Sequence, residues 1–317
     1  MITAWQFTNT HEPLRRVELD DPIAAAGGVV VDVKASGICH SDVGMLEDEG
    51  WLKILAKRPI TMGHEVAGVI SAVGAGVTEW KIGDRVGLCP TTSAGTPGYT
   101  FDGGYADKVA IGQEALVRIP DGVSFTDGAY ATDAGMTSHH AVVALGGATT
   151  GMKVGIIGLG GLGQIGARAA VLNGASVVAA EPNEKVWEIG RSLGVGDIRK
   201  DISDFDGDDL DLIVDFAGFG STTAGAIDVV RPGGTVVLVG MGRLTSEINT
   251  YNLIVNRIRL LGSAGGDPSD IAKIYGYMAD GSLTTTTTTV SFDEIPDGLG
   301  RLARGEVVGR LVASFGD

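Results

Sequence analysis

The chain has 317 residues, of which 44% are hydrophobic and 20% are charged, so it is long enough for two domains with sizeable cores. Asp and Glu outnumber Lys and Arg by 39 to 24, and the net charge of −15 argues against a protein that binds nucleic acid or an anionic membrane surface. No secretory signal is visible, and the most apolar stretch, residues 154–180, is interrupted by glycines and polar residues, unlike a membrane span. Cys39 and Cys89 lie far apart, which excludes a disulfide framework. These features predict an acidic α/β protein of the cytoplasm.

The first third of the chain is rich in short apolar runs that are separated by glycine and proline. We expect strands at residues 28–34, 66–73, 85–88 and 106–110. This pattern is typical of a compact, irregular β domain.

The middle of the chain alternates apolar strands with amphipathic helices. We expect strands at 154–157, 176–180, 211–216 and 235–239, and helices at 162–173 and 183–193. Such alternation predicts a parallel sheet with crossover connections. After residue 263 we expect a helix at 268–278, a strand from Thr284 and a last strand at 310–314. The threonine run 284–289 is interpreted as exposed strand without a function.

A glycine-rich loop lies directly between a predicted strand and a predicted helix. It matches G-x-G-x-x-G, and its candidate cofactor-binding residues are Gly158, Gly160, Gly161, Leu162 and Gly163. In such a loop the first glycine permits the turn, the second lets backbone N–H groups approach a pyrophosphate, and the third lets helix and strand pack closely. A plain helix-capping turn is the alternative interpretation.

Glu181 ends the next predicted strand, 18 residues after Gly163. A carboxylate there can accept hydrogen bonds from both hydroxyls of an adenosine ribose and repels a 2′-phosphate. No arginine follows in Pro182–Glu184 to receive such a phosphate. The sequence therefore favours NAD over NADP.

Two short segments, 37–42 and 63–65, combine a thiol, imidazoles and carboxylates. Cys39, His64 and the neighbouring acidic residues form a plausible set of zinc ligands. The alternative is that these side chains are buried structural residues.

The whole set of motifs resembles the zinc-containing medium-chain alcohol dehydrogenases. The motifs are Gly-Ile-Cys-His-Ser-Asp (37–42), Gly-His-Glu-Val-Ala-Gly (63–68), Val-Gly-x-Gly-Val (73–77), Gly-Asp-Arg-Val (83–86), Asp-Gly-Gly-Tyr-Ala (102–106), the glycine loop, and Gly-Glu-Val-Val-Gly-Arg (305–310). They span nearly the whole chain in the order of the family. The resemblance implies a GroES-like β-rich catalytic domain at 1–135 and 264–317, with a Rossmann domain at 136–263 between them.

The resemblance also implies the site residues. Cys39, His64 and Asp133 would bind one catalytic zinc, with Asp133 where the family usually has a cysteine. Glu65 would be an exchanging ligand or lie just behind the ligands, and Asp42 would hydrogen-bond the other ring nitrogen of His64. Ser41 would hydrogen-bond the substrate oxygen. Further contacts to NAD would come from His40, Thr137, Phe216, Val239, Gly240, Met241 and Arg310. The implied reaction is reversible hydride transfer between NAD and an alcohol, aldehyde or ketone.

The chain departs from the family pattern at two places. Many relatives carry a proton-relay histidine five residues after the ligand cysteine, where this chain has Gly44. The family's lobe of four cysteines that binds a structural zinc is reduced here to a segment with Cys89 alone, so we expect no structural zinc. Relatives usually form dimers or tetramers, and we expect a homo-oligomer. The alternatives are a zinc-independent quinone or enone reductase of the same fold and a nucleotide-binding sensor without turnover.

Overall fold

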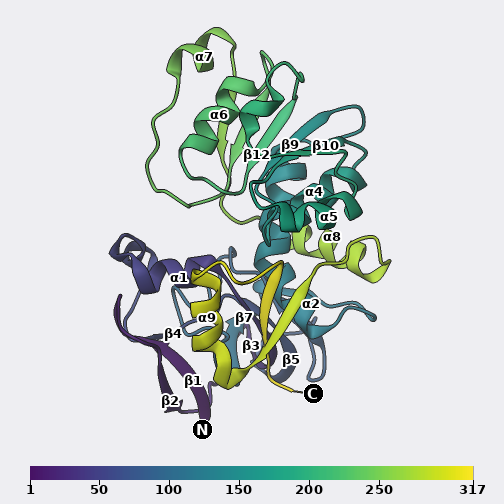
Figure 1. The fold of residues 1–317 in the computed structure, drawn as a ribbon. Coiled ribbons are helices and arrows are strands. Elements are labelled where there is room, and N and C mark those ends of the chain that lie inside the picture. Colours follow the sequence, from purple (N-terminus) through teal and green to yellow (C-terminus); the bar gives the residue numbers. More distant parts are fainter. Residues whose placement is uncertain (317) are drawn as a thin grey trace. The chain divides into compact units, whose positions relative to one another are not determined.

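The computed structural model describes residues 1–316, which form two compact units (Figure 1). The first unit comprises Met1–Asp133 and the carboxy-terminal segment that begins at Asp267, and the second comprises Ala134–Gly266. Among residues 1–316, no helix is both long enough and apolar enough to cross a membrane.

The first unit is built on two sheets. The smaller sheet has the order β2 (Arg15–Leu19), β1 (Ile2–Phe7), β4 (Ile60–Thr61). The larger has the order β15 (Thr287–Ser291), β16 (Arg310–Ser314), β3 (Gly28–Ile38), β5 (Glu65–Val73), β6 (Arg85–Leu88), β8 (Leu116–Arg118), and β7 (Lys108–Gly112) pairs with β3. Its neighbours are antiparallel except for β15 and β16.

The long strand β3 organises this sheet because its valine-rich sequence is buried along most of its length. Gly37 pairs with Glu65 at the start of β5, and Ile38 pairs with Leu311 in β16. The segments that follow β3, precede β5 and precede β16 therefore meet at one place. The helices of this unit are α1 (His40–Glu47), η1 (Glu49–Ile54), η2 (Gln113–Ala115), α2 (Phe125–Tyr130), α8 (Pro268–Ala279), η7 (Phe292–Glu294) and α9 (Ile295–Ala303).

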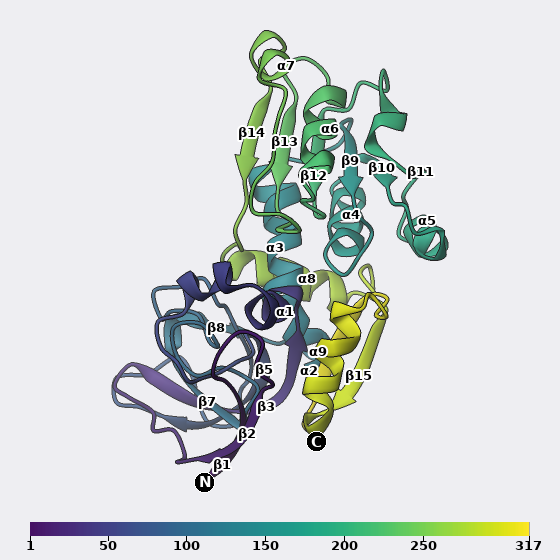
Figure 2. The same cartoon turned by 60° about the vertical axis from the view of Figure 1, so that its left-hand side comes forward.

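The second unit contains one six-stranded sheet, and Figure 2 shows its strands following one another across the view, from one edge strand to the other. Its order is β11 (Asp197–Arg199), β10 (Ser176–Ala180), β9 (Lys153–Ile157), β12 (Leu212–Asp215), β13 (Thr235–Leu238), β14 (Arg259–Gly262), and all pairs are parallel. This is the Rossmann order, in which the first strand in sequence lies at the middle of the sheet. The helices are α3 (Met136–His139), η4 (His140–Leu145), α4 (Gly163–Leu172), η5 (Glu184–Val186), α5 (Trp187–Ser192), η6 (Ile202–Phe205), α6 (Ser221–Val229) and α7 (Thr250–Val255), and the short π-helical η3 (Ala131–Gly135) contains the division between the units.

The predicted fold class, α/β with a parallel sheet beside a β-rich domain, is confirmed. Two strands lie a few residues away from their predicted positions. The strand expected from Thr284 begins at Thr287, because its partner Arg310 is the first residue of β16. The strand expected at 106–110 lies at Lys108–Gly112, where β7 pairs with β3. The helices that were not predicted include α1, α2, α6, α7 and α9.

Candidate active site

Cys39 stands at the junction of β3 and α1. Its backbone is extended (φ −115°, ψ 155°), and its N–H donates to Asp42 Oδ2 at 3.2 Å. The N–H of Asp42 donates back to the Cys39 carbonyl at 3.1 Å. This closed turn fixes the position of the thiol at the first residue before the helix.

Two glycines make room for the residues at the start of β5. A Cβ on Gly37 would lie 1.7 Å from Glu65 Oε2, so the Glu65 carboxylate occupies the space that any side chain at Gly37 would need. Gly63 has φ +94°, and a Cβ there would lie 2.5 Å from the Tyr105 ring. Because L residues avoid this backbone conformation, the glycine before His64 is a steric requirement.

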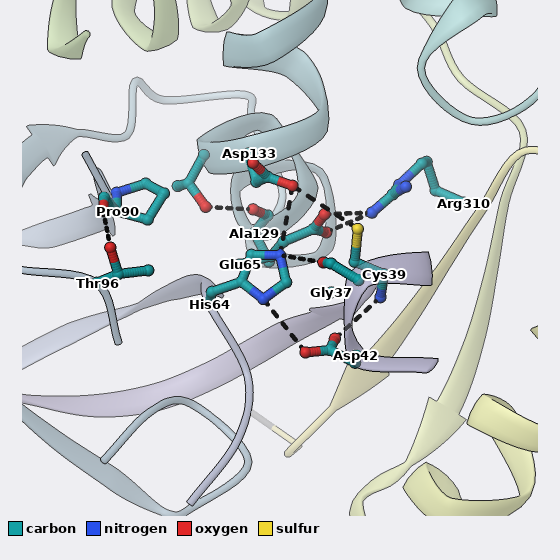
Figure 3. A network of polar contacts seen from close by, with 12 residues as sticks. Gly37, Cys39, Asp42, His64, Glu65, Pro90, Thr96, Ala129, Asp133 and Arg310 are labelled. Atoms are coloured by element: carbon teal, nitrogen blue, oxygen red, sulfur yellow. Dashed lines mark hydrogen bonds and ion pairs between the residues drawn. The ribbon is translucent and has the colours of Figure 1, made fainter. Parts of the chain in front are cut away.

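The three predicted zinc ligands converge (Figure 3). Asp133 Oδ2 lies 3.4 Å from His64 Nε2 and 3.8 Å from Cys39 Sγ. A tetrahedral zinc at ~2.0–2.3 Å from each ligand atom separates two such atoms by roughly 3.3–3.8 Å. The spacing of the side chains therefore fits one zinc ion. One oxygen of Glu65 also lies within 4.8 Å of the other three ligand atoms.

Asp42 supports the candidate ligand His64 from the side of its other ring nitrogen. It is fully buried, its Oδ1 lies 3.3 Å from His64 Nδ1, and its Oδ2 accepts a hydrogen bond from the Tyr105 hydroxyl at 2.8 Å. Burial by itself lowers the pKa of His64, but Tyr99, Asp42 and Asp133 raise that pKa well above its usual value. Surroundings that favour a proton on this imidazole also favour a metal cation beside it.

Glu65 forms a buried ion pair with Arg310. Both Glu65 oxygens accept hydrogen bonds from Arg310 Nη2, the longer of them at 2.6 Å, and both side chains are almost fully buried. Burial raises the pKa of Glu65 to about 7, although Arg310 opposes that rise. In this structure Arg310 therefore neutralises the carboxylate behind the ligands, and its predicted contact to a pyrophosphate stays a prediction.

Ser41 and His40 occupy the first turn of α1. Ser41 Oγ lies 3.4 Å from His64 Nε2, the same nitrogen that faces Asp133. Burial lowers the pKa of His40, and the charge of Arg310 lowers it further. Ser41 is therefore placed beside the candidate ligand atoms, and its contact to a substrate oxygen stays a prediction.

Gly44 lies one helical turn beyond Ser41. A Cβ on Gly44 would lie 2.6 Å from the indole of Trp51. The position at which many relatives carry a relay histidine is thus covered by Trp51, and a larger side chain there would displace the indole.

The glycine loop of the second unit has the three predicted properties. Gly158 has φ +86° and permits the turn after β9. A Cβ on Gly160 would meet no atom within 4 Å, so the backbone there is open to a ligand. A Cβ on Gly163 would lie 1.8 Å from the Gly158 carbonyl oxygen, so close packing requires glycine. These properties match the requirements of a pyrophosphate-binding loop at the N-terminus of α4.

Glu181 lies directly after β10 and contacts this loop. Its Oε2 accepts the N–H of Leu159 at 2.7 Å, and its Oε1 accepts the N–H of Asn183 at 2.8 Å. A carboxylate has about four acceptor sites, so two remain for ribose hydroxyls. Its predicted role in ribose binding is compatible with this placement.

The other predicted cofactor contacts in this unit lie in different surroundings. Phe216 follows β12, and a Cβ on Gly166 of α4 would lie 2.6 Å from its ring, so the ring packs against the helix. Val239, Gly240 and Met241 follow β13, and Met241 is 56% exposed. Thr137 is buried in α3. The loops after β9, β10, β12 and β13 lie at the carboxyl edge of the parallel sheet, where such folds bind dinucleotides.

Two tyrosines near the ligands were missed by the sequence analysis. Tyr105 positions Asp42, and its signal was present in the motif Asp-Gly-Gly-Tyr-Ala, to which we attached no role. The Tyr99 ring lies against His64 with centroids 5.0 Å apart. Nothing in the sequence around Tyr99 indicates this contact.

Comparison with known proteins identifies the family of the chain. Residues 25–121 match the alcohol dehydrogenase GroES-like domain family, and residues 161–280 match the zinc-binding dehydrogenase family. The chain is 30% identical to an alcohol dehydrogenase of Geobacillus stearothermophilus over 95% of this chain and 96% of that protein. It is 26% identical to the NADP-dependent alcohol dehydrogenase C 1 of Mycolicibacterium smegmatis over 98% of this chain and 97% of that protein.

Solved structures of dehydrogenases and reductases have the same fold over nearly the whole chain. The structure of acetophenone reductase from Geotrichum candidum in complex with NAD has a TM-score of 0.91 and 26% identity, and the match covers 99% of this chain and 97% of that chain. The alcohol dehydrogenase of Aeropyrum pernix has a TM-score of 0.90 and 26% identity, with 99% and 100% covered. The chain therefore belongs to the alcohol dehydrogenases of the medium-chain dehydrogenase/reductase family.

Proposed function

We propose that this protein catalyses the reversible, NAD-dependent oxidation of a primary or secondary alcohol at a single zinc ion held by Cys39, His64 and Asp133. The observation that carries the proposal is the close spacing of the three candidate ligand atoms: Asp133 Oδ2 lies 3.4 Å from His64 Nε2 and 3.8 Å from Cys39 Sγ. Three protein ligands leave one position for water or substrate, as catalytic zinc sites do.

The ligand set balances the charge of the metal. A thiolate, a neutral imidazole and a carboxylate together carry two negative charges, which neutralise Zn²⁺. Asp133 supplies a hard oxygen where many relatives supply a soft sulfur, so we expect weaker discrimination against Co²⁺ or Mn²⁺. When bound, zinc would supply a Lewis acid and NAD a hydride acceptor.

Residues of the chain would position the metal ligand His64, the substrate hydroxyl and NAD. Asp42 fixes the His64 tautomer so that Nε2 faces the other ligands. Ser41 lies beside that nitrogen and would accept the hydrogen bond of the substrate hydroxyl. Glu181 and the glycine loop would hold the adenosine ribose and pyrophosphate of NAD, and the carboxylate would disfavour NADP.

Two rival functions remain open. A quinone or enone reductase of the same fold would not need converging metal ligands, and a sensor without turnover would bind NAD alone. The convergence of Cys39, His64 and Asp133 supports the alcohol dehydrogenase over both.

Metal content and a panel of alcohols with NAD test the proposal together. We expect about one zinc per chain in protein purified without a metal-affinity tag. Asp133→Ala should lose zinc and turnover, while Asp133→Cys, which restores the usual family ligand, should keep both. NAD binding should persist in all three proteins. Wild-type protein that binds no zinc, or an Asp133→Ala variant with full activity, would refute the ligand assignment.

The count of one zinc depends on the segment that replaces the structural-zinc lobe. Cys89 is its only cysteine, is fully buried, and its Sγ lies 3.3 Å from the Thr91 hydroxyl. One thiol cannot hold a structural zinc, so two zinc ions per chain would contradict this part of the proposal.

We also propose that the protein is a cytoplasmic homo-oligomer that associates through the second unit. Three side chains of α7 are exposed, Tyr251 by 71%, Ile254 by 72% and Val255 by 55%, and α7 precedes the edge strand β14. Exposed apolar groups beside a sheet edge commonly mark an interface. Light scattering that gives the mass of a dimer or tetramer would agree, and a monomer would contradict it.

A further inference from the structure

Asp215 is a fully buried carboxylate to which the proposed function gives no role. It is the last residue of β12, an interior strand of the parallel sheet of the second unit. Its Oδ1 accepts the N–H groups of Ala217 at 3.0 Å and Gly218 at 2.8 Å. Its Oδ2 accepts the hydroxyls of Thr222 and Thr223 in α6, each at 2.8 Å. The acceptor sites of the carboxylate are therefore taken by the loop after β12 and by the helix that follows it.

The backbone of Asp215 also holds the loop after β13. Its carbonyl accepts the N–H groups of Val239 and Gly240, both at 3.0 Å. Further along the same loop, the N–H of Arg243 donates to the Gly218 carbonyl at 2.8 Å. Because the side chain of Asp215 binds one loop and its carbonyl binds the other, this residue ties the two loops together.

The two loops are packed backbone against backbone. Gly218 has φ +63°, and a Cβ there would lie 1.9 Å from the Gly240 carbonyl oxygen. A Cβ on Gly240 would lie 2.4 Å from the Ala217 carbonyl carbon. Such close packing leaves residues 216–220 and 239–243 little freedom to move separately, and we call these two segments the paired loops.

The order of the sheet indicates which part of NAD the paired loops would meet. Glu181, the candidate ribose-binding residue, follows β10, and the candidate pyrophosphate loop follows β9. Strands β12 and β13 lie on the side of β9 away from β10. A dinucleotide that runs along the carboxyl edge from β10 across β9 would therefore bring its nicotinamide half to the loops after β12 and β13.

We propose that Asp215 is a positioning residue for the nicotinamide half of the cofactor. Its hydrogen bonds hold the paired loops in the arrangement that receives this half, whereas the adenosine half binds at the glycine loop and Glu181 without its help. This inference rests on the proposed function, which assigns NAD to the second unit. Loss of the carboxylate should therefore weaken NADH and spare ADP-ribose, which has the same adenosine, pyrophosphate and second ribose but no nicotinamide.

Two substitutions separate this role from a general loss of structure. Asp215→Ala removes the acceptor of both loop N–H groups, whereas Asp215→Asn keeps one oxygen for them, and its NH₂ group can donate to the two threonine hydroxyls. In calorimetric titrations of zinc-loaded protein, Asp215→Ala should raise the Kd for NADH about tenfold, as the loss of one or two hydrogen bonds allows. Its Kd for ADP-ribose should stay within twofold of wild type. Asp215→Asn should restore NADH binding to within threefold.

Asp228→Ala is the matched control. Asp228 is an exposed aspartate of α6 in the same unit, and its Oδ1 accepts the side-chain NH₂ of Asn252 at 2.6 Å. Both dissociation constants should stay within twofold of wild type in this variant. An unchanged Kd for NADH in Asp215→Ala, or an equal rise for NADH and ADP-ribose, would overturn the inference.

A second measurement needs neither a variant nor turnover. In hydrogen–deuterium exchange of the zinc-loaded wild type, peptides of the paired loops should be protected more by NADH than by ADP-ribose, while the glycine loop 158–163 should be protected equally by both. Equal protection of the paired loops by the two ligands would overturn the inference. The expected pattern in a protein that oxidises no alcohol would support the inference and refute the proposed alcohol oxidation alone. A protein that binds neither ligand would refute both.

Discussion

Replacement of Asp42 by asparagine tests the support of the zinc site without touching a ligand. Asp42 Oδ2 accepts the N–H of Cys39 at 3.2 Å and the hydroxyl of Tyr105 at 2.8 Å, while Oδ1 faces His64 Nδ1 at 3.3 Å. With a metal on Nε2, Nδ1 carries a proton and donates it to Oδ1. The carboxylate therefore serves three donors in a fully buried place.

An amide group of the same shape cannot serve all three donors. If the amide oxygen accepts from Cys39 and Tyr105, the NH₂ group faces the N–H of His64. If the amide is flipped, the N–H of Cys39 loses its acceptor and the Tyr105 hydroxyl is left with the Gly37 carbonyl at 3.4 Å. A buried donor without a partner costs about 1–3 kcal/mol. At about 1.4 kcal/mol for each factor of ten, zinc affinity should fall roughly 5- to 150-fold. Removal of a group that supports a metal ligand typically costs about 10- to 100-fold.

The assay is a competition titration of metal-stripped protein with a chromogenic zinc chelator. Asp48→Asn is the matched control, because Asp48 lies at the other end of α1, is exposed, and its side chain accepts the N–H of Gly50 at 2.7 Å. It should bind zinc as the wild type does. Folded Asp42→Asn with wild-type zinc affinity would refute the reasoning, as would an equal loss in Asp48→Asn.

Two further substitutions and one labelling experiment have outcomes that the structure specifies. Gly37→Ala should lower the free energy of unfolding by about 1–3 kcal/mol in urea titrations, because its Cβ would overlap the Glu65 carboxylate; an unchanged midpoint would show that Glu65 can move away. Glu181→Ala should weaken the binding of NAD more than that of NADP, because the carboxylate that repels a 2′-phosphate and holds the N–H of Leu159 is gone. The Kd for NADP divided by the Kd for NAD should therefore fall, and a constant ratio would exclude the ribose assignment. Burial raises the pKa of the Cys89 thiol, so at about pH 8 this thiol stays protonated and should react with iodoacetamide only in unfolded protein; rapid labelling in the folded protein, detected by peptide mass spectrometry, would contradict this.

The Rossmann unit was predictable because its signals are local. Apolar runs of strand length alternate with helical periodicity, and the glycine loop stands directly between one strand and one helix. Each glycine has a steric reason that can be stated from spacing alone, and the structure shows those reasons at Gly158 and Gly163. The end of β10 at Ala180, just before Glu181, follows from the same local pattern.

The convergence of the three candidate ligands could be predicted only through the resemblance to a family. Cys39 and His64 stand in short, unusual segments, but Asp133 has no such signal of its own. It lies 94 residues from Cys39, in a π-helical turn that the sequence did not indicate. Periodicity reports which residues share one element, and it carries no information about which distant elements meet.

The pairing of charges and hydroxyls around the ligands was decided by the tertiary structure. Arg310 reaches Glu65 across 245 residues because β16 pairs with β3 at Leu311 and Ile38, while β5 pairs with β3 at Glu65 and Gly37. Tyr99 reaches His64 because its segment packs on Gly63. Sequence alone fixes the chemistry that each side chain can offer. Sheet register and burial decide which partner it meets, because a buried charge or hydroxyl must find its partner among the groups that folding brings beside it.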